Sequence, residues 1–122
     1  VMQMVWMLKS VKNLIKNKNI YLGDIDTRKI TDMSELFFIS NRKDFSGIEN
    51  WDTSNVTDMS SMFSDSKATT LDLSSFDTSN VTNMYAMFSW SSATTGYART
   101  QTDADKLNST SYKPSRLNFI VK

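Results

Sequence analysis

The stretch that decides the fold is LDLSSFDTSNVTNMYAMF, at residues 71–88. Its central part occurs earlier in the chain as WDTSNVTDMSSMF at residues 51–63 and as IDTRKITDMSELF at residues 25–37. The three segments align without gaps, and successive copies lie 26 and 25 residues apart. Self-similarity at a period of about 20–50 residues is the signature of a repeat architecture. The sequence therefore predicts three copies of one unit.

Each unit has the same internal pattern. Apolar residues alternate ahead of every Asp-Thr pair, as Leu71, Leu73 and Phe76 do, which is typical of a short strand with one buried face. The Asp-Thr-Ser-Asn chemistry that follows favours a turn. A Met-x-x-Met/Leu-Phe stretch then places apolar residues at i, i+3 and i+4, and this spacing predicts a short helix capped by the preceding Thr.

A unit of this size cannot bury its apolar side alone, so we expect the units to stack. The predicted fold is α/β: a short right-handed solenoid of three coils, each a short parallel strand plus a short helix. Stacking should align two buried columns, Met33, Met59 and Met84 in one and Phe37, Phe63 and Phe88 in the other. The expected parts of the single repeat domain 1–122 are an N-terminal cap helix (1–19), three repeats (20–44, 45–70 and 71–95) and a C-terminal cap (96–122).

The two flanks have the patterns of caps. Residues 4–15 carry apolar residues at helical spacing, with lysines elsewhere on the surface, which predicts a helix that seals the first unit. A membrane-surface helix is the alternative. At the other end, Thr102 with Asp105 predicts a helix start, and residues 117–121 alternate as a final strand. The apolar positions of the first helix are Met4, Leu8, Val11 and Ile15.

Composition excludes several functional classes. The chain has no Cys and no His, which removes disulfides, zinc–thiolate sites, nucleophilic cysteines and histidine-based triads. Its 14 basic and 13 acidic residues give no reason to expect nucleic acid as a partner. The charge is uneven, because residues 1–22 hold four lysines and no acid. No run reaches the roughly 20 apolar residues of a membrane span, and a start at Val1 without signal-peptide features suggests a processed form or a fragment.

The sequence of residues 71–88 resembles the 25–26-residue repeats of bacterial surface proteins related to the BspA-like leucine-rich repeat group. Such repeats also occur in mycoplasma lipoproteins. The flanks are similar too, with NIYLGDIDT at 19–27 resembling the entry segment and residues 96–122 resembling the closing segment. The resemblance implies a leucine-rich-repeat-like solenoid and a cell-surface or secreted location. It also implies a role in adhesion and recognition, and no catalytic residues.

The repeat also accounts for most residues that an active site would need. Without His or Cys, only carboxylate or Ser-Lys pairs could act in catalysis, and none stands apart from the repeated positions. The ladder Asp26, Asp52 and Asp77 has one Asp per turn and no Gly in the turn, so stabilisation of the turn is expected rather than calcium binding. We therefore expect no enzyme, no metal and no cofactor.

Residues that break the repeat are the candidates for a binding site. Tyr85 stands where the other units have Ser, and Trp90 stands where the second unit has Asp, with Tyr97 nearby in sequence. Large aromatic residues at otherwise polar positions are typical of binding surfaces. The alternative is that Tyr85 and Trp90 pack under the C-terminal cap. A second candidate surface is the outward face of the expected sheet around Tyr21, Glu49 and Asp72.

The functional hypothesis is a non-catalytic, adhesin-like recognition module at a bacterial cell surface, or secreted. Its expected partner is a host or cell-surface protein or glycan, and any membrane attachment would come through a lipid anchor upstream of this chain. The alternative is a structural spacer within a larger surface protein, with no ligand of its own. The ligand and the oligomeric state stay open at this point.

Overall fold

The computed structural model describes residues 8–122 and side chains from residue 11 onward. The fold is mixed α/β with a small parallel sheet in the order β1-β2-β3. In chain order the elements are helix α1 (Leu8–Ile15), 3₁₀ turns η1 (Leu22–Asp24) and η2 (Ile48–Asn50), strands β1 (Thr70–Leu73) and β2 (Thr95–Ala98), helix α2 (Gln101–Asn108) and strand β3 (Asn118–Val121).

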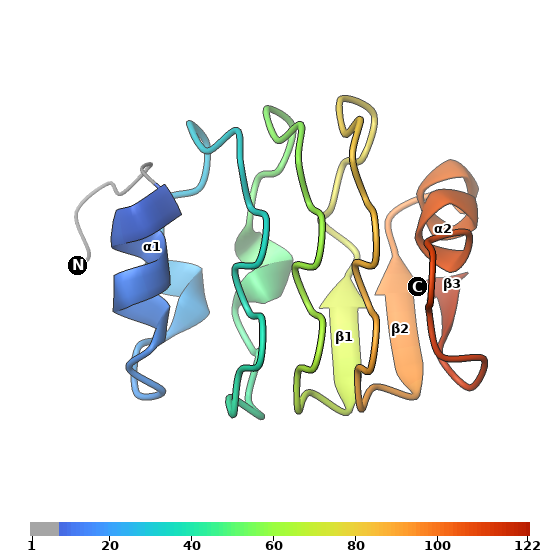
Figure 1. Cartoon of the computed structure of the whole chain (residues 1–122). Coiled ribbons are helices and arrows are strands. Elements are labelled where there is room, and N and C mark those ends of the chain that lie inside the picture. Colours follow the sequence, from blue (N-terminus) through green and yellow to red (C-terminus); the bar gives the residue numbers. More distant parts are fainter. Residues whose placement is uncertain (1–7) are drawn as a thin grey trace.

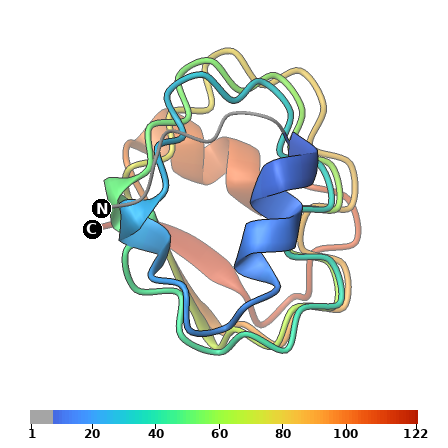
Figure 2. The same cartoon turned by 90° about the vertical axis from the view of Figure 1, so that its left-hand side faces the viewer.

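The repeat units lie side by side in sequence order, with α1 at one end and α2 with β3 at the other (Figure 1). Seen along the stack, successive units follow nearly the same closed path (Figure 2). The strands lie on one side of this path. The segments 33–40, 59–66 and 84–91 lie on the other side, and we call the surface that they form the turn face. The apolar core lies between these two sides.

Strands form in only part of the predicted places. β1 belongs to the third unit and pairs in parallel with β2, which pairs with β3. The corresponding parts of the first and second units form the 3₁₀ turns η1 and η2 instead of strands. Gly47 has a left-handed backbone (φ 97°), and the ring of Tyr21 lies over Gly23 and Gly47. This arrangement interrupts the extended backbone that a strand requires.

The helices predicted at residues 33–37, 59–63 and 84–88 do not form; the backbone makes successive turns there. Along residues 33–39 and 59–65, every second N–H donates to a carbonyl of the next unit. Met33 N, for example, lies 2.8 Å from Asp58 O. A helix would use these donors within its own segment. Left-handed residues allow the alternation, and they are Glu35, Ile39, Ser61, Asp65, Ala86 and Trp90.

The predicted columns of the core are confirmed. The ring of Phe63 stacks between those of Phe37 and Phe88, with centroid distances of 5.4 and 5.7 Å and interplanar angles of 11° and 6°. Met33 and Met59 are fully buried, and Met84 in the last unit packs against the core partly buried. Burial of these large side chains provides the main stabilisation of the stack.

The predicted N-terminal helix is present as α1, whose residues Val11 and Ile15 are buried. Met4, which belongs to the same prediction, lies outside the described residues. The polar stretch 38–43 holds the extra residue of the first spacing, but Arg42 within it does not protrude into solvent. Its guanidinium is buried and donates to the carbonyls of Ile15, Asn17 and Ile20, so it fastens the end of α1 to the first unit.

The C-terminal helix and strand are also present, as α2 and β3. The helix begins two residues earlier than predicted, because Thr100 rather than Thr102 is its N-cap. The Thr100 hydroxyl accepts a hydrogen bond from Asp103 N–H, and the Asp103 carboxylate takes the role predicted for Asp105. Capping of the helix by a threonine hydroxyl is confirmed with a shifted register, but the Asp103 carboxylate accepts from the Thr100 hydroxyl rather than from the backbone N–H that a capping box uses.

Candidate functional site

Two sequence-predicted site residues, Tyr85 and Trp90, point outward from the turn face. Tyr85 is 58% exposed and Trp90 is 81% exposed. These exposures do not fit the alternative that both rings pack beneath the C-terminal cap. An exposed tryptophan contributes little to the core, so its presence at this position calls for a different explanation.

The backbone at Trp90 has a conformation that recurs in the repeat. Ile39, Asp65 and Trp90 occupy equivalent positions in the three units, all left-handed, with φ of 56°, 58° and 59°. Asp tolerates this conformation, whereas bulky side chains are strained in it. Ile39 is also exposed, so the left-handed backbone belongs to the repeat rather than to Trp90 alone. What distinguishes Trp90 is a large aromatic ring that is even more exposed than Ile39.

The structure adds Tyr112, which sequence reasoning missed. It is 70% exposed, has φ 63°, and its ring meets that of Tyr85 edge-on at 5.9 Å and 88°. Hydrogen bonding to Tyr112 raises the pKa of the Tyr85 hydroxyl. Tyr112 lies in the closing segment outside the repeat, so no departure from a repeated position could have revealed it. The only signal was an aromatic residue two positions before Pro114.

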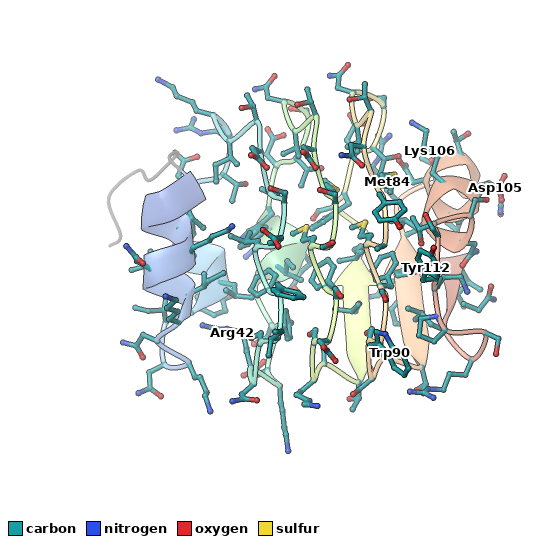
Figure 3. The ribbon with its side chains drawn as sticks, in the orientation of Figure 1. Arg42, Met84, Trp90, Asp105, Lys106 and Tyr112 are labelled. Atoms are coloured by element: carbon teal, nitrogen blue, oxygen red, sulfur yellow. The ribbon has the colours of Figure 1, made fainter. Side chains whose placement is uncertain are left out.

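Two hollows lie between the third unit and the closing segment 109–116. Figure 3 shows Tyr112 of this segment between Met84 and Trp90. We call the two hollows together the edge groove. The first, of about 400 Å³, is lined by Ser89, Trp90, Ser91, Tyr112, Lys113, Pro114 and Arg116. The second, of about 310 Å³, is lined by Val81, Thr82, Met84, Lys106, Ser109, Thr110 and Ser111.

The charge of the edge groove is positive. Its charged lining residues are Lys106, Lys113 and Arg116, with no acid among them. Both lysine ammonium groups donate to carbonyls of the protein, Lys106 to Thr78 and Lys113 to Pro114 and Leu117. Among residues 8–122, neither ammonium group donates to a carboxylate, so no ion pair offsets these two positive charges. The groove therefore combines exposed aromatic rings with a positive field, a combination suited to binding rather than to proton transfer.

The second predicted surface, on the sheet side, has local partners for each of its residues. The Glu49 carboxylate accepts from Gly47 N–H at 3.0 Å, and the Tyr21 ring covers Gly23 and Gly47. Burial disfavours ionisation of Asp72, but hydrogen bonds from Lys122 and Ser74 outweigh it and lower the pKa of Asp72.

Only two of the three predicted residues of this second surface line a common hollow. Glu49 and Asp72 line one hollow of about 390 Å³, and Tyr21 is not among its lining residues. Tyr97, which is near Trp90 in sequence, lies in register with Asp72 on the sheet, with the Lys122 ammonium 5.3 Å from the centroid of its ring. Tyr97 therefore does not belong to the aromatic site of the turn face.

Comparison with known proteins gives a family. The family model described as "Mycoplasma protein of unknown function, DUF285" matches residues 2–112. The chain belongs to this family. No curated protein and no solved structure matches the chain. The family description names no activity, so the functional argument rests on the site itself.

The described part of this DUF285 chain holds no group of three or more His, Cys, Asp or Glu placed to bind a metal ion. The carboxylates of Asp26, Asp52 and Asp77 accept from backbone N–H groups two residues on, which is the turn role predicted for them. Along residues 8–122, no helix is both long and apolar enough to cross a membrane.

Proposed function

We propose that this chain is a non-catalytic recognition module, at a bacterial cell surface or secreted, that binds a host or cell-surface protein or glycan through the aromatic end of its turn face. The observation that carries the proposal is Trp90, which is 81% exposed in a left-handed backbone. Tyr112 lines the same hollow as Trp90, and its ring contacts that of Tyr85, which extends the exposed aromatic area. Tryptophan and tyrosine are the residues that most often dominate binding energy at interfaces.

The proposal includes the finer fold assignment, a short right-handed leucine-rich-repeat-like solenoid of the BspA-like type. Its support is the stacking of units 25–26 residues apart and the parallel pairing of β1, β2 and β3. A rigid stack of this kind presents side chains of successive units on one continuous face. Adhesion and a lipoprotein form of the parent protein belong to the same proposal.

The test uses the full chain and a Tyr85→Ser/Trp90→Asp variant, which carries the residues of the second unit at both positions. Wild-type protein and the variant are compared on an array of glycans and extracellular-matrix proteins, and the melting temperature of each is measured. We expect saturable binding of the wild type, a loss of about 30-fold or more in the variant and a nearly unchanged melting temperature.

Two results would contradict the proposal. If the double variant unfolds, the aromatic residues serve packing rather than recognition. If the wild type binds nothing on the array, the alternative of a structural spacer is favoured. A matched control is Glu49→Gln on the sheet side, which should leave binding unchanged because Glu49 lies in a different hollow.

A further inference from the structure

The first hollow of the edge groove, which Trp90 lines, is a concave site with two walls, and we call it the Trp90 hollow. One wall belongs to residues 89–91 of the third unit, and the other belongs to residues 112–116 of the closing segment. Its volume of about 400 Å³ lies within the range of small-molecule sites. Because the closing segment already lies along the third unit, the Trp90 hollow suits a compact ligand rather than an added strand.

Each wall of the Trp90 hollow carries an exposed aromatic ring, Trp90 on the third unit and Tyr112 on the closing segment (Figure 3). The Tyr112 ring contacts that of Tyr85 edge-on at 5.9 Å, which restrains its orientation. The face of an aromatic ring is apolar and carries partial negative charge. It therefore attracts a ligand surface made of C–H groups. A sugar ring has such a surface on one face, because its hydroxyls lie mainly around the rim.

The Trp90 hollow also has polar groups that suit the hydroxyls of a sugar. The side-chain hydroxyl of Ser89 forms no hydrogen bond with another residue of the described part of the chain, 8–122. A hydroxyl both donates and accepts, so Ser89 can pair with a sugar hydroxyl in either sense. A few polar groups set among aromatic rings are the usual composition of a small-ligand site.

The charge of the Trp90 hollow comes from Lys113 and Arg116, and no acid lines it. The Lys113 ammonium donates to the carbonyls of Pro114 and Leu117, which leaves one of its three N–H groups for a ligand. Arg116 donates to the carbonyl of Ser91 and forms no ion pair within residues 8–122. The fork of an arginine side chain matches the two oxygens of a carboxylate. The Trp90 hollow therefore favours a ligand that carries a carboxylate.

Other classes of ligand would use only part of this arrangement. An inorganic anion would pair with Lys113 and Arg116 and leave both aromatic faces in water. A neutral sugar would cover the rings and leave the two cations unpaired. An acidic peptide would meet an edge that the closing segment already covers. A second copy of this chain would bring the same cations face to face, which disfavours self-association. An acidic sugar uses the rings and the cations together.

We propose that the Trp90 hollow binds a sugar that carries a carboxylate, with the C–H face of the sugar against Trp90 and Tyr112 and its carboxylate at Arg116 and Lys113. Tyr85 does not line this hollow and acts through its contact with Tyr112. The inference rests on the proposed recognition function and narrows its ligand class from protein or glycan to an acidic saccharide.

The experiment is an NMR titration of the full chain with two probes that differ only at C6, the methyl glycosides of glucuronic acid and of glucose. The Trp90 indole N–H and the Arg116 Nε–H are followed as reporters of the two halves of the site. Glucuronate should shift both signals saturably, with a Kd about tenfold lower than that of glucose. Added salt should weaken the binding of glucuronate and leave that of glucose unchanged.

Variants separate the two halves of the site. Arg116→Gln should raise the Kd of glucuronate about tenfold and leave that of glucose within about twofold, because only the carboxylate contact is lost. Trp90→Ser should weaken both sugars by about tenfold, since both stack on the indole. Lys18→Gln is the matched control for charge. It removes one exposed positive charge at the other end of the stack and should bind both sugars like the wild type.

A second acidic sugar, N-acetylneuraminic acid, distinguishes two sources of the same chemistry. Its carboxylate marks the end of a glycan chain, whereas glucuronic acid occurs within chains. Preference for either acid over glucose, lost in Arg116→Gln, supports the proposal, and the tighter of the two identifies the source.

Four results would overturn the proposal. Equal, Trp90-dependent binding of glucuronate and glucose removes the role of the carboxylate and leaves the recognition function intact. Shifts as large with inorganic sulfate as with glucuronate reduce the hollow to a simple anion site. Binding of a protein or an acidic peptide through Trp90, with no response to any sugar, overturns the saccharide inference alone. Absence of binding to the sugars and to every member of the array overturns the proposed function as well.

Discussion

Replacement of Asp103 by Asn tests how the C-terminal cap closes the stack. Asp103 is buried, with the residue 2% exposed. Its carboxylate accepts from Thr78 N–H at 3.0 Å, from the Thr78 and Thr100 hydroxyls at 2.6 Å, and from Arg99 Nε at 3.0 Å. Burial disfavours its ionisation, but these hydrogen bonds outweigh burial and lower the pKa of Asp103 to about 2. The carboxylate therefore stands in for the next-unit backbone carbonyl that accepts from the equivalent threonine hydroxyl in the earlier units.

The size of the expected destabilisation follows from the shift in the pKa of Asp103. A fall from the ordinary value of 3.8 to about 2 corresponds to roughly 2.5 kcal/mol of folding free energy. Because the pKa is lower in the folded state, the stabilisation is complete above about pH 5 and is lost as the pH falls towards 2. Asp103→Asn should therefore lower the free energy of unfolding by about 2.5 kcal/mol at pH 7.

Urea denaturation followed by circular dichroism at several pH values between 7 and 2 measures this effect. The difference between wild type and Asp103→Asn should shrink as the pH falls. Asp105→Asn is the matched control, because Asp105 lies on the same helix, is exposed, and its carboxylate bonds only to Gln101. A difference that is absent at pH 7, or that stays constant down to pH 2, would refute the role given to the carboxylate.

Three further substitutions test other contacts. Arg42→Met should lower the free energy of unfolding by about 3 kcal/mol in urea denaturation, because it leaves three backbone carbonyls near the end of α1 without their donor; a loss below about 0.5 kcal/mol would contradict this account. Asn108→Leu should lower the free energy of unfolding by about 2 kcal/mol, since the Asn108 amide pairs with the backbone N–H and carbonyl of Phe119 on the free edge of β3. It should also promote association of the chain, measured by light scattering. A variant that stays a stable monomer would argue against this account. Trp90→Asp should change the free energy of unfolding by less than about 1 kcal/mol, because relief of the left-handed backbone strain offsets the small loss of buried apolar area. A loss of about 3 kcal/mol would show that Trp90 is a packing residue.

The sequence was sufficient to predict the repeat, the stacking and the columns of the core. Identical residues at a fixed spacing can all be buried only if the units lie one on another, and the stacked rings of Phe37, Phe63 and Phe88 confirm this. The end helices could also be predicted, because apolar spacing and threonine capping are local signals. Their exact register, as at Thr100, could not.

The local structure of each unit was harder to predict. The i, i+3, i+4 pattern from Met59 to Phe63 fits a helix, but it equally fits a series of turns whose N–H groups bond to the next unit. Hydrogen bonds between units are not encoded in the pattern of one unit. Similarly, alternation predicted strands in all three units, but of these only residues 70–73 form one. It pairs with residues 95–98, which pair in turn with residues 118–121.

The residues of the candidate site were also only partly predictable from the sequence. Tyr85 and Trp90 could be found because they depart from a repeated position. Tyr112 could not be found, since its contact with Tyr85 depends on how the closing segment meets the third unit. Departures from a repeated position can be read from the sequence. The contacts that the closing segment makes with the last unit require the structure.

The most direct test of the central claim is chemical-shift mapping of the full chain with the ligand that binds most tightly on the array. The account predicts that shifts concentrate at the Trp90 indole and along residues 84–91 and 110–116, around the edge groove. Shifts centred on Tyr21, Glu49 and Asp72, with the Trp90 indole unaffected, would contradict it and move the binding surface to the opposite side of the stack.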